Sequence, residues 1–334
     1  MRARGIALLF IASGILLFLT GCSASIIRQA IQQADTAIQD KKYDQATTIL
    51  ETQLQKYPYS QPLLIKKAEL VRTQQDYSWF LDLQPRLSVR ALRNYPELQR
   101  REVIALIKTN HVDQANQRLD DLLSKSPGNA DRLQLKGQLA YLQEQMDEAI
   151  DLYDQALASD STNTEALVNK AVALADRGDL LESLDLLDSA LQLAPDDYLI
   201  RYNKGTVLSD LGFQQKSLLA TGAFSYFSEA LRHFEKAYML HPESTDTLIR
   251  LGITYLDLGN TEKAHSALEV ALSQDPALVD AWYYEGKTYL AENDIQEAKT
   301  TFEHLLTIDP EYELAQQELI DIKQEQGTWD EILE

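Results

Sequence analysis

The sequence repeats itself with a period of 34 residues, and this period constrains the fold more than any other feature. In the unit 279–312, Trp282, Gly286 and Tyr289 occupy positions 4, 8 and 11 of the first half. This spacing places them on one stripe of an α-helix. Pro310, at position 32, ends a second helix. Because one such pair of helices cannot bury its apolar face, neighbouring units must stack into a solenoid.

Repeat units are predicted across residues 27–312, and a capping helix is predicted over 313–334. Small residues at positions 8, 20 and 27 allow two antiparallel helices to approach closely. Gly178, Gly212 and Gly259, near position 15, suit the turn between the two helices. The predicted units are 27–60, 61–95, 96–129, 130–163, 164–197, 198–244, 245–278 and 279–312.

Two of these units are irregular. The unit 61–95 carries Pro85 inside its second helix, where a kink or break is expected. The unit 198–244 is 13 residues longer than the others, with an insertion near 213–225. Apolar residues in this insertion indicate either a lengthened helix that packs locally or a binding device. They are Phe213, Leu218, Leu219 and Phe224.

The pattern of the units resembles the tetratricopeptide repeat (TPR) family almost position for position, although another solenoid of helical hairpins would share much of it. The resemblance implies an all-α fold, a right-handed superhelical solenoid of antiparallel helix pairs. It also implies a concave groove, lined by the first helix of each unit, that binds a protein partner. The candidate groove residues are Arg100, Arg101, Asn169, Tyr202, Asn203, Arg250, Tyr283, Tyr284 and Lys287.

Two kinds of side chain stand out among these candidates. Asn169 and Asn203 share position 6, where some family members place asparagines that bond to a peptide backbone; polar surface filler is the alternative. Tyr202 and Tyr283 are candidate anchors, since aromatic residues are typical of interface hot spots. Position 5 does not match the clamp that family members use for acidic C-terminal tails, so such a tail is not the expected partner.

The first residues are typical of an export signal. Arg2 and Arg4 precede an apolar run over 5–19, which is shorter than the roughly 20 residues that span a bilayer. The run ends in Leu-Thr-Gly-Cys at 19–22, which resembles the lipobox of bacterial lipoproteins. The resemblance implies that 1–21 is a lipoprotein signal peptide, that Cys22 is lipidated and that 22–26 is a short linker. An ordinary signal peptide with a chance cysteine is the alternative.

Lipidation of Cys22 would anchor the chain to a membrane of the bacterial cell envelope. The residue after Cys22 is Ser23 rather than aspartate. In the sorting rule of enteric-type bacteria, this favours the outer membrane, with the chain facing the periplasm.

Charge is divided unevenly along the chain. The whole sequence has a net charge of -20, which argues against a nucleic-acid partner. Residues 22–136 carry a net charge of +4, whereas residues 137–334 carry -26. A basic group in the first part would suit an anionic membrane surface, or would simply be a solvated helix face. Its members are Arg86, Arg90, Arg93, Arg100 and Arg101.

Patterns typical of catalysis or cofactor binding do not occur in the sequence. The five histidines lack metal-ligand spacing, and one cysteine cannot build a Cys-based zinc site. We therefore predict no enzyme, no cofactor and no metal, but a lipid-anchored scaffold that binds protein partners in the bacterial envelope. A pilus, secretion or outer-membrane assembly would be an example. The alternative is a ligand-capturing accessory lipoprotein of a solute transporter, which would need a closed apolar cavity.

Overall fold

The computed structural model describes residues 24–74, 77–88, 90, 95–218 and 222–333. The signal segment, Cys22, Ser23, Arg93 and Leu219 therefore lie outside the described residues. All regular secondary structure in the described part is helical, as predicted for an all-α solenoid. None of the helices there is both long and apolar enough to cross a membrane.

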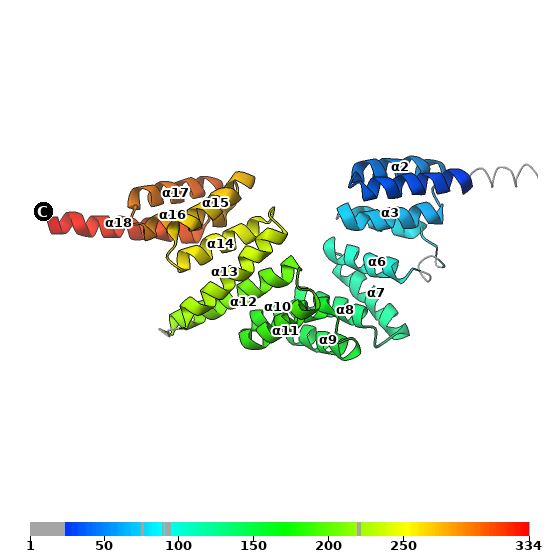
Figure 1. Ribbon diagram of the computed structural model, residues 1–334, viewed down its shortest axis with the longest axis horizontal. Coiled ribbons are helices and arrows are strands. Elements are labelled where there is room, and N and C mark those ends of the chain that lie inside the picture. The colour runs from blue at the N-terminus through cyan, green and yellow to red at the C-terminus, as the bar shows by residue number, and fades with distance from the viewer. Residues whose placement is uncertain (1–23, 75–76, 89, 91–94, 219–221, 334) are drawn as a thin grey trace, which may run out of the picture. The chain divides into compact units, whose positions relative to one another are not determined.

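The chain divides into two compact units, Met1–Glu144 and Gln145–Glu334. The boundary falls in a turn inside the repeat predicted over 130–163. The first unit begins with a helix over 24–39 and continues with short antiparallel helices (Figure 1). These are α2 (Tyr43–Lys56), α3 (Gln61–Gln74), α4 (Tyr77–Leu83), the 3₁₀ turn η1 (Gln84–Arg86), α6 (Pro96–Lys108), α7 (Val112–Lys125) and α8 (Ala130–Leu142).

The second unit is a row of helical hairpins followed by one longer helix (Figure 1). Each helix packs against its neighbour in sequence, and first helices of successive repeats also touch. The helices are α9 (Met146–Ser159), α10 (Thr164–Arg177), α11 (Leu180–Leu193), α12 (Tyr198–Ser217), α13 (Ala223–Leu240), α14 (Thr245–Asp257), α15 (Thr261–Gln274), α16 (Val279–Ala291), α17 (Ile295–Ile308) and α18 (Glu313–Leu333).

Helix ends follow from local chemistry. Asn163 and Asp197 cap α10 and α12 by accepting hydrogen bonds from backbone N–H groups of the first turn. Position 15 adopts positive φ at Gly178 and Gly259, as predicted for the turn between two helices. The same prediction is wrong for Gly212, which lies inside α12.

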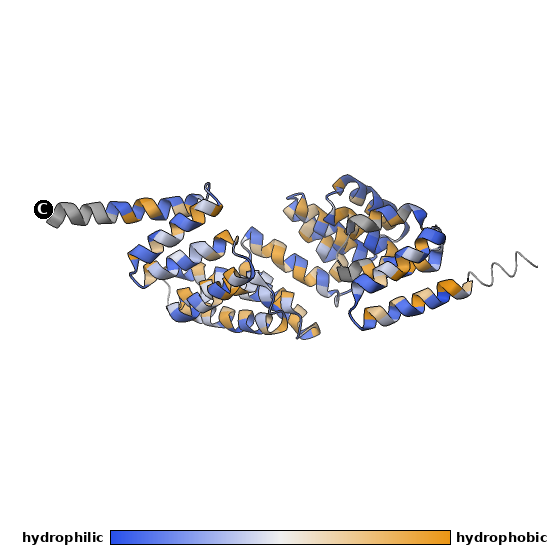
Figure 2. Cartoon of the chain, turned by 90° about the horizontal axis from the view of Figure 1, so that it is seen from above, coloured by the Kyte–Doolittle hydropathy of each residue, from blue (hydrophilic) through white to orange (hydrophobic). Residues whose placement is uncertain are grey.

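Glycine at position 8 sets how closely paired helices approach. A Cβ atom on Gly286 would lie 2.5 Å from the ring of Phe302, and one on Gly205 would lie 2.7 Å from the ring of Phe234. The aromatic rings thus rest directly on the backbone of the preceding helix, and both are fully buried. Figure 2 shows hydrophobic and hydrophilic residues interspersed along the helices, as expected of amphipathic helices that each bury one face.

Gly212 repeats this packing two turns further along α12. A Cβ atom there would lie 2.6 Å from the ring of Phe227, which is buried. The insertion therefore lengthens both helices of the hairpin and extends its core, so that α12 has 20 residues and α13 has 18. Gly212 is a packing glycine, which explains why it does not form the predicted turn.

Lysines with largely buried side chains join successive repeats. Lys170 of α10 lies 2.9 Å from Asp154 of α9, and its side chain is only 10% exposed. Three other pairs have the same sequence separation of 16 residues. Each lysine stands at position 7 of a first helix and each acid at position 25 of the preceding unit. These pairs are Lys67–Glu51, Lys136–Asp120 and Lys204–Asp188.

The repeat 61–95 interrupts this series at Pro85. Here α4 ends at Leu83 and the 3₁₀ turn η1 follows, so the break predicted at Pro85 is present. Pro85 occupies the position of the acid, and Glu102 occupies that of the lysine. Glu102 instead binds Arg118 of α7, with 2.9 Å between Oε2 and Nη2.

Candidate functional site

The first helices of the second unit form a continuous surface that carries most of the predicted groove residues. α10 contacts α12, α12 contacts α14, and α14 contacts α16. We call the exposed side of these four helices the first-helix face. Its predicted members are Asn169 on α10, Tyr202 and Asn203 on α12, Arg250 on α14, and Tyr283, Tyr284 and Lys287 on α16.

Arg250 lies at the centre of the first-helix face. Its guanidinium donates a hydrogen bond to Tyr202, and the charges of Asp210 and Tyr284 act on it as well. Burial lowers the pKa of Arg250. The hydrogen bond to Tyr202 and the charges of the nearby acidic groups raise it by more, so the pKa of Arg250 lies above its usual value. The face therefore contains a fixed, half-buried cation bordered by aromatic hydroxyls.

A row of aspartates follows the same face, and the predicted groove set did not include it. Asp176, Asp210 and Asp257 all stand at position 13 of their repeats. Burial raises the pKa of Asp210, while the charge of Arg250 lowers it and that of Asp176 raises it further. Burial also raises the pKa of Asp257, although Lys216 lies only 2.9 Å from its Oδ1. The sequence signal for this row was the recurrence of aspartate at position 13 in three repeats.

The two tyrosines of α16 differ in exposure. Tyr284 is half-buried, whereas Tyr283 is 9% exposed and packs against Phe302 and Tyr312. The hydroxyl of Tyr283 donates to Glu318 of α18 at 3.2 Å, and Lys287 lies 2.7 Å from the same carboxylate. Tyr283 and Lys287 thus hold α18 in place, while Tyr284 presents more of its ring to the surface.

The two candidate asparagines lie on neighbouring helices of the first-helix face. Asn169 of α10 and Asn203 of α12 are both half-buried. They share position 6 with Arg250 and Tyr284 of the next two repeats. The face therefore carries two amides, a guanidinium and a phenol along one row, all of which can donate hydrogen bonds.

In the first unit, Arg100 and Arg101 lie on α6. Arg101 donates from Nη1 to the backbone oxygen of Ala68 at 2.6 Å, which ties α6 to α3. Arg100 is half-buried and lines a cavity of about 180 Å³ between α6, α7 and α8. Arg86, another member of the basic group, donates to the backbone oxygen of Pro58 at 2.9 Å. Part of this basic group therefore has a structural role.

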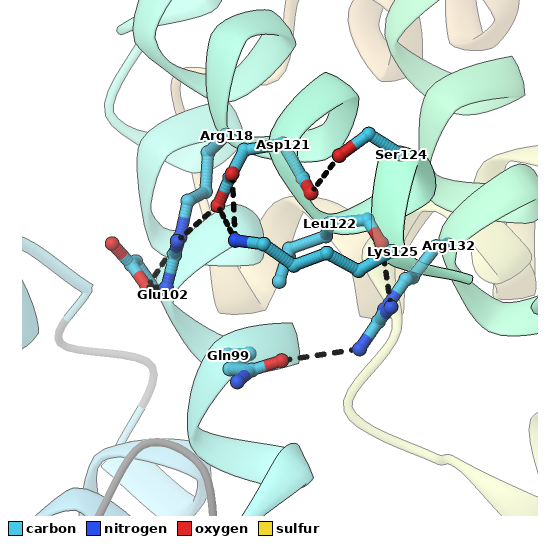
Figure 3. A network of polar contacts seen from close by, with 8 residues as sticks. All are labelled: Gln99, Glu102, Arg118, Asp121, Leu122, Ser124, Lys125 and Arg132. Carbon is cyan, nitrogen blue, oxygen red and sulfur yellow. Dashed lines mark hydrogen bonds and ion pairs between the residues drawn. The ribbon is translucent and has the colours of Figure 1, made fainter. Parts of the chain in front are cut away.

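A polar network borders a larger cleft in the first unit (Figure 3). Arg118 lies between Glu102 and Asp121, and Lys125 lies 2.6 Å from Asp121. Burial raises the pKa of Glu102, against the opposing effect of Arg118. The cleft has a volume of about 680 Å³ and is lined by Leu81, Pro85, Glu102, Leu106, His111, Gln114, Gln117, Arg118 and Asp121. These charged and amide side chains mean that it is not the closed apolar cavity that a solute-capturing protein would need.

No three side chains of the types His, Cys, Asp and Glu come together as metal ligands anywhere in the described part of the chain. His265 lies near two glutamates: its Nδ1 is 2.7 Å from Oε1 of Glu285, and its Nε2 is 3.3 Å from Oε2 of Glu292. These contacts join α15 to α16, and the imidazole ring lies tilted against the ring of Tyr289, with 4.6 Å between their centroids.

Sequence models of the tetratricopeptide repeat match residues 100–164, 136–198, 227–284 and 279–312. Together these matches span more than half of the chain. The chain is a tetratricopeptide repeat protein. TPR proteins bind protein partners and are generally non-catalytic, so the fold is that of a protein-interaction scaffold. A search of curated proteins gave no match.

Solved structures share the TPR fold with this chain. PilF of Pseudomonas aeruginosa is 18% identical with a TM-score of 0.57, and the match covers 70% of this chain and 98% of PilF. YrrB, described as a TPR protein with an unusual peptide-binding site, is 22% identical with a TM-score of 0.48, over 60% of this chain and 96% of YrrB. A thermophilic TPR protein of Thermus thermophilus is 19% identical with a TM-score of 0.48, over 58% of this chain and 99% of that protein. These similarities concern the fold alone.

Proposed function

We propose that this TPR protein is a non-catalytic, lipid-anchored scaffold that holds a protein partner at the bacterial envelope through its first-helix face. An assembly such as a pilus, a secretion system or an outer-membrane complex would supply the partner. The observation that supports partner binding best is the half-buried Arg250, which interacts with Tyr202, Asp210 and Tyr284 on the first-helix face, the side on which the family resemblance leads us to expect a partner. The lipobox-like segment ending at Cys22 supports the anchor.

The arrangement favours an extended or helical segment of a protein as the ligand. Asn169 and Asn203 offer amides to backbone groups, and Tyr284 offers an aromatic surface. Arg250 offers a charge that is already desolvated in part, so a partner's acceptor gains more from it than from a fully hydrated arginine. The aspartate row at position 13 would in turn favour cationic side chains on the same segment.

Replacing Arg250 with methionine should weaken partner binding by about tenfold or more, since arginine at an interface centre is a frequent hot spot. A photo-crosslinking residue at position 203 would trap the partner in cells, and the affinity of the purified pair would then be measured. Arg232→Met on the exposed side of α13 is the matched control. Tyr202→Phe, which removes only the hydrogen bond to Arg250, should cause a smaller loss. Equal affinities for both methionine variants would contradict binding at this face.

Lipid anchoring has a separate test. Cys22→Ala should abolish incorporation of an alkyne-labelled fatty acid, because no acyl acceptor would remain. Ser23→Ala is the control and should keep the label. A labelled Cys22→Ala protein, or an unlabelled wild-type protein, would refute the anchor while leaving the first-helix face untouched.

A further inference from the structure

The end of the α12–α13 hairpin exposes apolar side chains that the hairpin's own core does not use. Phe213 packs against Phe227 with 5.1 Å between ring centroids, and this contact closes the extended core. Beyond it, Leu218 is 68% exposed and Phe224 is 67% exposed. A helix lengthened only for local packing would not need large apolar residues there.

The same segment differs in charge from the rest of the second unit. Residues 211–228 contain no aspartate or glutamate and a single lysine, although residues 137–334 carry a net charge of -26. The corresponding turns after α10, α14 and α16 each carry or adjoin a carboxylate, at Asp179, Glu262 and Glu292. At this turn, therefore, exposed apolar side chains occur without an acidic neighbour, whereas the exposed Leu181 at the α10–α11 turn lies beside Asp179. This difference favours contact with a surface that would desolvate or repel carboxylates.

The length of the hairpin separates this end from the acidic helices. α12 has 20 residues and α14 has 13, so α12 runs about 10 Å further at 1.5 Å per residue. This distance is close to the Debye length of about 8 Å at physiological ionic strength. Repulsion between the acidic unit and an anionic surface is therefore weakened by salt when only the hairpin end makes contact.

We propose that the hairpin end, represented by Leu218 and Phe224, inserts into the interfacial region of a lipid bilayer. A protruding end fits a bilayer better than a folded protein, because a protein would need a preformed cavity whereas lipids adapt to the inserted shape. The inference rests on the proposed function, since lipidation at Cys22 would keep the chain near a bilayer and raise the effective concentration of the hairpin end there.

The experiment uses residues 22–334 with Cys22→Ser, which is the proposed mature chain without its acyl groups. Its partitioning onto vesicles of phosphatidylethanolamine and phosphatidylglycerol is measured by co-sedimentation. The double variant Leu218→Ser/Phe224→Ser should partition about tenfold less, because two apolar insertions are lost. Leu181→Ser/Met239→Ser is the matched control, since Leu181 is 64% exposed and Met239 is 72% exposed on the same unit. This control should partition as the parent does.

Insertion depth provides a second readout. In a Phe224→Trp variant, the additional tryptophan emission should shift to shorter wavelength when vesicles are added, and brominated lipids should quench it. Absence of vesicle binding by the parent, or equal partitioning of the two double variants, would overturn the proposal. So would a protein trapped by a crosslinker at position 224 without any lipid quenching, which would assign the hairpin end to a protein groove. Because the chain used carries no lipid, failure of lipidation in cells would refute the proposed anchor and not this result.

Discussion

Replacing Phe302 with alanine is expected to lower the free energy of unfolding by about 3–5 kcal/mol. The Phe302 side chain is fully buried between α16 and α17 and lies 5.9 Å from the ring of Tyr283. Its loss would leave a cavity that the two helices cannot close, because Gly286 already brings their backbones together. Urea denaturation followed by circular dichroism would measure the change.

Gly286→Ala tests the same contact from the other side. The new Cβ atom would lie 2.5 Å from Cε1 of Phe302, so the helices must separate or the ring must move. We expect a loss of about 1–3 kcal/mol in the wild-type background, as for other overpacked cores. In the Phe302→Ala background the same substitution should cost much less, because the cavity accepts the methyl group. Additive effects to within about 0.5 kcal/mol would contradict the contact.

The sequence was informative about repeat architecture because each position has its own steric role. Positive φ at Gly178 and the contact of Gly286 with Phe302 both follow from the repeat positions alone. Gly212 was misassigned because its position also suits a turn. Phe227 and Phe234 are seven residues apart on α13, as Gly212 and Gly205 are on α12, and this matched spacing could have identified a second packing layer.

The candidate site was less accessible from sequence. The repeat positions placed the candidate residues on the first helices α10, α12, α14 and α16, but they could not show that Tyr283 is buried against Phe302. That burial depends on α18, whose docking through Glu318 has no signature in the repeat pattern. Asp210 was left out of the candidates although its position 13 lies on the side of the helix opposite the buried stripe. Its closeness to Arg250 arises only when α12 and α14 pack.

His233 provides a pH-dependent contribution to stability that the sequence alone did not indicate. It lies on α13, is 8% exposed, and its Nδ1 has no hydrogen-bond partner in the described part of the structure. Burial lowers the pKa of His233 to about 4, and the charges of Lys204, Arg201 and Arg232 lower it in the same direction, against Asp188. The folded chain therefore keeps this imidazole neutral at pH values where an exposed histidine would be protonated.

The sign of the effect follows from proton uptake. Between pH 6.5 and about 4 the unfolded chain binds a proton at residue 233 and the folded chain does not, so the free energy of unfolding falls as the pH falls. The stabilisation from the neutral imidazole is present in full at pH values well above 6.5. By pH 5 the free energy of unfolding has fallen by about 2 kcal/mol. His233→Gln should remove this part of the pH dependence, whereas His304→Gln, at an exposed histidine of α17, should leave it unchanged.

The measurement is a set of urea unfolding curves for the wild type and both variants at intervals from pH 7.5 to pH 5. Carboxylates also titrate toward the lower end of this range, but they contribute equally to all three proteins. The difference between wild type and His233→Gln therefore isolates the imidazole, and it should change by about 2 kcal/mol across the series. Parallel curves for these two proteins would mean that the folded chain protonates His233 as readily as the unfolded chain, despite the cations of Lys204 and Arg201 beside it.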